Sequence, residues 1–189
     1  MTAPACIDVE RLNRLLRALI DEYSPSGKEH EVVAVAERAL TEAGLPVTRL
    51  PVSDGRDDLV VLPDEGEAEL VFVGHLDTVP AYDIDDFGFR REGSNVYGLG
   101  AADMKGGCAA MIEAFVAWQA AGQETIPAAL ALVVGEEETG DGCAALLDRH
   151  RFAWALVGEP TDLQPCLGCW SYLELEVEAR GRRAHASLG

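Results

Sequence analysis

Residues 70–80 read LVFVGHLDTVP, an apolar stretch that runs directly into a histidine and an acid. The apolar start, Leu70–Val73, predicts a buried β-strand. Ligands of open parallel sheets collect at the carboxyl ends of the strands, so the residues that follow this strand are candidates for a site. His75 and Asp77 are two positions apart, and in extended chain their side chains therefore point to the same side.

Other predicted strands are followed by acids in the same way. The acidic run Glu136–Glu138 comes after the apolar segment 128–134, and Glu159 comes after the apolar segment 153–157. Asp103 follows a glycine-rich loop that begins at Gly98. Each acid alone has an ordinary explanation, as a helix N-cap, a solvated loop or a turn. Carboxylates gathered at one sheet edge repel each other, so together they indicate a cation.

The segments between the strands have the apolar period of helices. Strands that alternate with helices and are apolar throughout predict an α/β fold with a mostly parallel sheet, covered by helices on both faces. Residues 172–179 instead alternate between apolar and polar, which is typical of a strand with one wet face. We therefore expect a first domain over residues 1–170 and the beginning of a second over residues 171–189. Predicted helices cover 8–22, 26–43, 104–121 and 142–150, and predicted strands cover 59–62, 70–73, 128–134 and 153–157.

Composition narrows the class of protein and of partner. The chain has 189 residues, 48% of them hydrophobic, and a formal net charge of -18. This indicates a globular protein and argues against nucleic acid or an anionic membrane as partner. The N-terminus does not read as a signal peptide, and no apolar stretch approaches the roughly 20 residues of a membrane span. Five cysteines, an odd number, favour a reducing cytoplasm. Cys166 and Cys169 form a lone CxxC, which we interpret as structural thiols rather than a metal site.

The residue types at the strand ends suggest which cation and which chemistry. One imidazole among several carboxylates suits zinc, manganese or cobalt rather than calcium. Asp77 can orient the His75 ring. Glu137 and Glu138 are neighbours whose side chains diverge in extended chain, so one can bind metal while the other acts as a base. This division is what metal-assisted hydrolysis requires.

Two other classes of active site fit poorly. The glycines at 98 and 100 could begin a dinucleotide loop, but Asp103 stands where the third glycine is needed and would face the pyrophosphate. A GxSxG nucleophile elbow is absent from the sequence.

Four motifs follow one another along the chain: VGHLDTVP (73–80), GLGAADMKGG (98–107), GEEETG (135–140) and GEPT (158–161). Together they resemble, in order and spacing, one family, the M20-type dinuclear zinc peptidases and deacylases. The family includes acetylornithine deacetylase, succinyl-diaminopimelate desuccinylase, aminoacylase-1 and carboxypeptidase G2. The resemblance covers essentially the whole chain. It implies a zinc-peptidase catalytic domain followed by a smaller α+β lid or dimerisation domain, in a homodimer.

The resemblance implies a site for two divalent metal ions, zinc first, with cobalt or manganese as alternatives. His75 and Glu159 would bind one ion, Glu138 would bind the other, and Asp103 would bridge both. The family commonly has a cis peptide bond after the bridging aspartate, here between Asp103 and Met104. Glu136 stands where the family more usually has an aspartate, which leaves a one-residue ambiguity in the alignment of this loop.

The resemblance also implies the catalytic residues. Glu137 would be the general base that takes a proton from the bridging water and returns it to the leaving amine, and Asp77 would support His75. His185, in the segment GRRAHAS (181–187), would steady the oxyanion from the lid domain.

The function implied is hydrolysis of the amide bond of a small N-acyl amino acid, as in a deacetylase or desuccinylase of cytoplasmic amino-acid biosynthesis. The alternatives are a dipeptidase or carboxypeptidase of the same family, or a non-catalytic truncated chain. Family members continue beyond the lid and supply a last histidine ligand for the second metal. We therefore expect these 189 residues to be an N-terminal part of such an enzyme, inactive alone.

Overall fold

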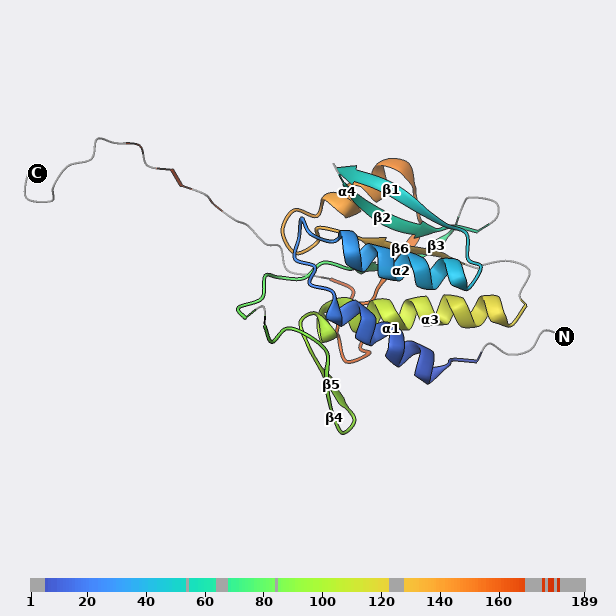
Figure 1. The fold of residues 1–189 in the computed structure, drawn as a ribbon. Helices are drawn as coiled ribbons and strands as arrows, with labels where there is room; N and C mark the ends of the chain where they lie inside the picture. Colours follow the sequence, from blue (N-terminus) through green and yellow to red (C-terminus); the bar gives the residue numbers. More distant parts are fainter. Residues whose placement is uncertain are drawn as a thin grey trace, which may run out of the picture.

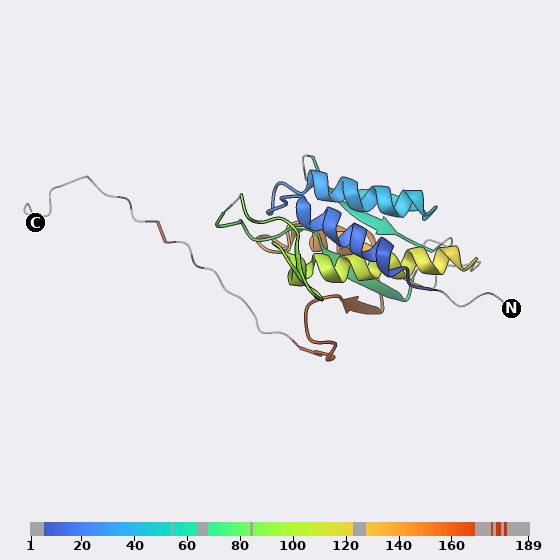
Figure 2. The same ribbon diagram turned by 60° about the horizontal axis from the view of Figure 1, so that its bottom comes forward.

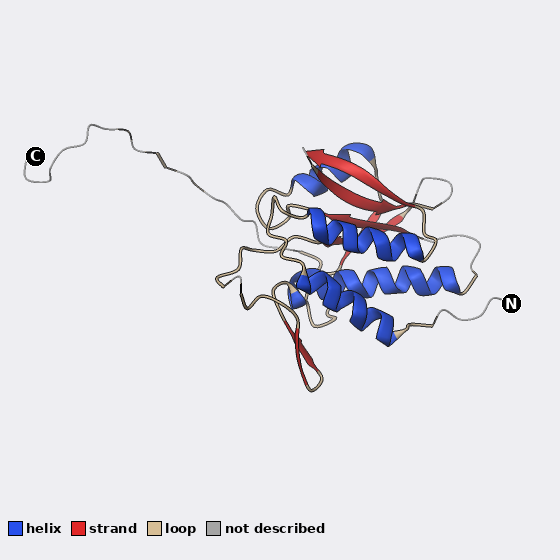
Figure 3. Ribbon diagram, in the orientation of Figure 1, coloured by secondary structure: helices blue, strands red, loops and turns tan. Residues whose placement is uncertain are grey.

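The computed structural model describes residues 6–53, 55–63, 68–83, 85–122 and 128–168, together with 175, 177, 178 and 180. Two helices come first in the described chain, five strands follow, and helices and strands alternate from residue 106 onward (Figures 1 and 3). The helices are α1 (Val9–Asp21), α2 (His30–Glu42), α3 (Gly106–Ala120) and α4 (Asp141–Arg149). The strands are β1 (Val47–Ser53), β2 (Arg56–Val61), β3 (Leu70–His75), β4 (Arg90–Glu92), β5 (Asn95–Tyr97), β6 (Ala129–Val133) and β7 (Trp154–Val157).

The main sheet is mixed, with the strand order β1-β2-β6-β3-β7. β3 pairs in parallel with β6 and with β7, whereas β2 pairs antiparallel with both β1 and β6. The α/β prediction is confirmed, but the sheet is mixed rather than mostly parallel in its pairing: among its five strands, only β2 runs opposite to the others. A run of apolar residues reports that a strand is buried, but not the direction in which it runs. β1 was not predicted, because it contains Pro51 and leaves several of its side chains exposed.

Helices cover both faces of the sheet, as predicted, with α1, α2 and α3 together on one face and α4 on the other (Figures 1 and 2). Alternate residues of each central strand point to opposite faces. In β6, Leu130 and Leu132 join the core under the three helices, whereas Ala129, Ala131 and Val133 join the core that includes Leu146 of α4.

The parallel strands end at one edge of the sheet. His75, the last residue of β3, lies opposite Val133 of β6, and Val73 lies opposite Val157 of β7. The segments that follow β3, β6 and β7 therefore leave the sheet at the same edge. This confirms the expected convergence of the strand ends.

A distorted turn, Ala101–Lys105, precedes α3 and carries Asp103. The peptide bond between Asp103 and Met104 is cis, as expected. Buried Lys105 donates from Nζ to the carbonyl of Glu22, 2.8 Å away, and so ties the turn to the end of α1. At Gly107 a Cβ would lie 2.3 Å from the carbonyl oxygen of Gly158, so only glycine lets α3 begin this close to the segment after β7.

Helix α2 begins later than predicted. The pair Ser26 and Glu29 reads as a capping box, but the helix starts at His30 and the structure shows no side-chain cap. Ser26 Oγ instead donates to Asp77 at 2.6 Å, and the Glu29 carboxylate accepts from Gly27 N and from Arg56. A buried carboxylate and a guanidinium are stronger partners than the helix end, so both side chains turn away from it.

The remaining features lie at the periphery. β4 and β5 form a two-stranded hairpin that projects from the body (Figure 1). β7 forms an edge of the main sheet, and its Trp154 and Val157 side chains are exposed. None of the helices in the described ranges is both long enough and apolar enough for a bilayer span. The expected domain boundary near residue 170 and nearly all of the expected lid segment lie outside the described residues.

Candidate active site

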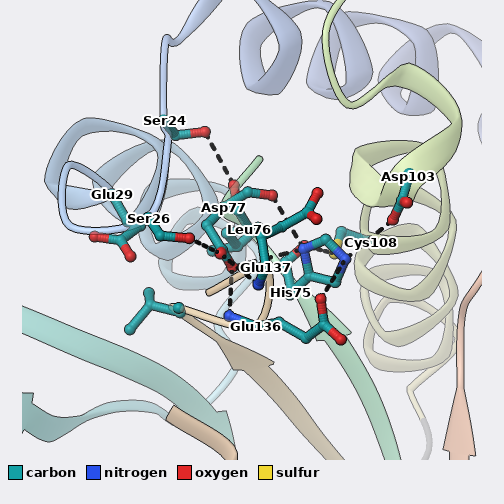
Figure 4. A network of polar contacts seen from close by, with 12 residues as sticks. Ser24, Ser26, Glu29, His75, Leu76, Asp77, Asp103, Cys108, Glu136 and Glu137 are labelled. Atoms are coloured by element: carbon teal, nitrogen blue, oxygen red, sulfur yellow. Dashed lines mark hydrogen bonds and ion pairs between the residues drawn. The ribbon is translucent and has the colours of Figure 1, made fainter. Parts of the chain in front are cut away.

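Three predicted metal ligands converge at the edge where the parallel strands end. Ligand atoms of His75, Asp103 and Glu159 all lie within 4.8 Å of one another. His75 Nε2 is 3.1 Å from Asp103 Oδ1 and 3.6 Å from Glu159 Oε1. The imidazole is buried at the end of β3, whereas Asp103 is exposed on the turn before α3 (Figure 4). One buried nitrogen and two accessible carboxylates thus face a common point.

Asp77 lies behind His75 and is completely buried. Its carboxylate Oδ1 is 3.6 Å from His75 Nδ1, and Nδ1 lies 3.0 Å from the Asp77 carbonyl oxygen. Burial alone would raise the pKa of Asp77, but hydrogen bonds from His75 and Ser26 lower it. An ionised Asp77 holds the imidazole so that Nε2 points toward Asp103 and Glu159.

The acidic loop, Gly135–Gly140, is attached to the same aspartate. The backbone N–H groups of Glu136 and Glu137 each donate to Asp77 over 3.1 Å (Figure 4). The Glu136 carboxylate lies 3.7 Å from His75 Nε2. Glu138 is exposed and lies outside the group of converging ligand atoms found among the described residues.

The electrostatics of this cluster favour a cation. Burial opposes a charge on His75, but Asp77 and Glu136 outweigh it and raise the pKa of the imidazole to about 9. Burial and the Asp103 carboxylate raise the pKa of Glu137. Burial likewise raises the pKa of Glu159; His75 opposes this rise, and Asp103 and Glu136 add to it. One imidazole and two carboxylates at these separations are a donor set that fits zinc or a similar divalent ion.

The structure brings some of the predicted site residues together. His75, Asp103 and Glu159 lie close to one another, and Asp77 lies against His75. Glu138 does not join them. His185 and Cys169 lie outside the described residues, and Cys166 is an exposed free thiol.

Sequence reasoning missed two contributors to this site, Ser26 and the Glu136 side chain. For Ser26, the available signal is its place in the small polar segment Ser24–Gly27, between the first two predicted helices.

The strand that leads into the acidic loop is anchored by a second buried aspartate. Asp58 of β2 accepts from Val134 N at 3.0 Å, and its Oδ2 has no hydrogen-bond partner among the described residues. Burial raises the pKa of Asp58 to about 7. The side chain is inaccessible to solvent, so the ionised form is poorly accommodated above that pH.

We expect the free energy of unfolding to fall as the pH rises from about 4 to about 7, because folded Asp58 keeps a proton that the unfolded chain has lost. Asp58→Asn should remove this slope. The difference in free energy of unfolding between variant and wild type should therefore shift in favour of the variant by on the order of 2 kcal/mol between pH 5 and pH 8. Urea unfolding of both proteins at the two pH values measures this difference. Equal pH dependence in wild type and variant would contradict the assignment.

A cavity of about 680 Å³ opens beside Glu159. Its lining is largely apolar and includes Met111 of α3 and Leu156 of β7. The cavity is large enough for a small molecule and adjoins the converging ligands.

Comparison with known proteins agrees with this geometry. Residues 71–187 match the sequence model of the family described as peptidase family M20/M25/M40. Succinyl-diaminopimelate desuccinylase of Corynebacterium glutamicum is 33% identical over 183 residues, which cover 92% of this chain and 48% of that protein. Acetylornithine deacetylase of Vibrio campbellii is 29% identical over 154 residues, covering 77% of this chain and 40% of that protein.

The fold is also found in solved structures of other proteins. The crystal structure of aminopeptidase PepT from Bacillus cereus superposes with a TM-score of 0.63 at 24% identity, over 80% of this chain and 43% of that one. The chain spans about half the length of the curated relatives cited here. The family match covers more than half of the chain and includes all four strand-end motifs, so the chain belongs to the M20/M25/M40 family of peptidases.

Proposed function

We propose that this protein contributes the metal-binding half of a hydrolase that cleaves the amide bond of a small N-acyl amino acid. The observation that carries the proposal is the convergence of His75, Asp103 and Glu159, with Glu137 close by. Relatives named as a desuccinylase and a deacetylase favour an acyl-amino-acid substrate over a longer peptide. The cavity beside Glu159 offers room for such a molecule.

Each residue has a proposed part in the reaction. His75 and Glu159 would hold one divalent ion, and Asp103 would bridge it to a second. When bound, these ions would polarise the amide carbonyl and acidify the attacking water. Glu137 would accept the proton of that water and deliver it to the leaving amine nitrogen. The raised pKa of Glu137 suits both transfers, because a base works best when its pKa approaches the working pH.

The second ion needs a further ligand from the acidic loop. Glu138 is our proposed ligand, because it follows the proposed base directly and its exposed side chain is free to turn inward. Glu136, whose carboxylate already lies 3.7 Å from His75 Nε2, is the alternative. Metal analysis of Glu138→Gln and Glu136→Gln decides between them: the true ligand is the one whose loss lowers the bound metal.

The proposed function is tested by metal content and by hydrolysis, measured on the 189-residue chain and on the natural-length protein. Inductively coupled plasma mass spectrometry should find up to two divalent ions per active chain. A screen of acetyl-, succinyl- and glutamyl-capped amino acids should find turnover, and dipeptides in the same screen test the alternative of a dipeptidase or carboxypeptidase. Substoichiometric metal with no turnover in either form would reject the hydrolase.

Several finer points stay predictions. They are the oxyanion role of His185, the homodimer, the cytoplasmic location, the biosynthetic pathway and the inactivity of the 189-residue chain alone.

A further inference from the structure

The acidic loop is held at both ends by side chains from outside it. At its start, Asp77 accepts the N–H groups of Glu136 and Glu137. Directly after its end, Asp141, the first residue of α4, binds the guanidinium of Arg56 through both of its carboxylate oxygens. The position of Glu137 therefore depends on Asp77 on one side and on Arg56 on the other.

Arg56 joins two carboxylates that come from different elements. Its Nε and Nη2 donate to Glu29, just before α2, over 3.1 and 2.8 Å, while Nη1 and Nη2 donate to Asp141. The Arg56 side chain is 16% exposed and that of Glu29 only 1%. Removing one partner of a buried pair is costly because the other charge stays uncompensated. The connection between Glu29 and Asp141 therefore depends on the positive charge of Arg56.

Both attachments of the loop lead back to one segment, Ser24–Glu29. Glu29 Oε1 also accepts the N–H of Gly27 at 2.9 Å, and Ser26 Oγ donates to Asp77 at 2.6 Å (Figure 4). The polar contacts thus run from one end of the acidic loop to the other through the connection between α1 and α2. The side chains in this path are Asp141, Arg56, Glu29, Ser26 and Asp77.

Gly135 shows how closely Arg56 approaches the loop. This residue has φ +73°, and a Cβ placed on it would lie 2.5 Å from Arg56 Nη2. The guanidinium therefore lies against the first residue of the loop and also binds the residue that follows its last. A shift of Arg56 would move both ends together.

We propose that Arg56 is a positioning residue for Glu137, which it holds beside His75 and Asp103 by joining Asp141 to Glu29. The kinetic part of this inference rests on the proposed function, because it takes Glu137 as the base. A displacement of about 1 Å at a reacting group can lower the rate about 100-fold. Loss of Arg56 therefore lowers kcat and leaves in place His75, Asp103 and Glu159, none of which lies in the acidic loop.

The test compares Arg56→Met with Arg49→Met in the natural-length protein. Arg49 of β1 is a matched control: it joins Glu37 of α2 to Asp57 of β2 over 2.6 and 3.2 Å, and neither partner adjoins the acidic loop. Arg56→Met should lower kcat about 10- to 100-fold, with KM and bound metal within about twofold of wild type. Arg49→Met should leave kcat within about twofold of wild type.

Hydrogen exchange gives a second readout that does not need turnover. The amides of Glu136 and Glu137 should exchange about tenfold faster in Arg56→Met and at the wild-type rate in Arg49→Met. If wild type proves inactive, the proposed function fails but exchange still tests the role of Arg56. Unchanged exchange, or equal losses of kcat in both variants, would overturn the inference. If Arg56→Met does not fold, Arg56→Lys takes its place in the test. Lysine keeps the positive charge but lacks the planar guanidinium that binds both carboxylates at once, and the same outcomes apply.

Discussion

Replacing Glu137 by glutamine should lower kcat by about 100-fold or more, while the protein keeps its bound metal. The amide has nearly the shape of the carboxylate but cannot accept a proton from water, and general-base catalysis contributes about 100- to 10,000-fold. Glu137 lies outside the converging group of His75, Asp103 and Glu159, so its charge is not needed to hold the ion proposed at that group. Steady-state kinetics and metal analysis on the same preparation measure both effects.

Glu42→Gln, at an exposed glutamate at the end of α2, is the control for this experiment, since it makes the same change outside the acidic loop. If Glu137→Gln loses its metal while Glu138→Gln keeps it, the roles of Glu137 and Glu138 are exchanged. Wild-type turnover in Glu137→Gln would exclude it as the base.

Asp103→Ala should release most of the bound metal and abolish turnover. Asp103 Oδ1 lies 3.1 Å from His75 Nε2, and its carboxylate is the one proposed to bridge both ions. In the proposed site, its loss would leave the first ion with two of its three protein ligands and the second without its shared ligand. After a dialysis in which wild type keeps its metal, the variant should retain fewer than about 0.2 ions per chain, because an incomplete ligand set weakens metal binding steeply.

Asp148→Ala, at an exposed aspartate of α4, is the matched control for an aspartate-to-alanine change and should retain metal and activity. Circular dichroism of both variants checks that the fold is intact. An Asp103→Ala protein that keeps full metal would place the binding site elsewhere in the molecule.

Much of this site could be foreseen from the sequence, because its residues follow strands that are recognisable by their composition. Leu70–Val73, Ala129–Val133 and Trp154–Val157 are short apolar runs, and each continues into His75, the acidic loop or Glu159. Parallel pairing then brings these ends together. Asp103 could be predicted from its motif but not from its local structure, which is an irregular turn.

The failures share a physical cause, which is competition between local and distant partners. Ser26 and Glu29 have the spacing of a helix cap, yet Asp77 and Arg56 lie far away in sequence and bind them instead. The mixed direction of the sheet depends on how β2 meets β6, about 70 residues later, and not on the pattern within either strand. Which loop glutamate faces His75 is likewise decided by the hydrogen bonds that Asp77 makes to the loop backbone.

The pairing of β3 between β6 and β7 also bears on the order in which the protein matures. During synthesis, His75 leaves the ribosome long before its neighbours in the sheet, and Glu159 can reach it only after α3, β6 and α4 have been made. A nascent chain that ends before residue 159 therefore lacks part of the metal pocket, however well its earlier helices have formed. Binding of the proposed ion would accordingly be a late event in biogenesis, and it would report that the central pairing of the sheet is complete.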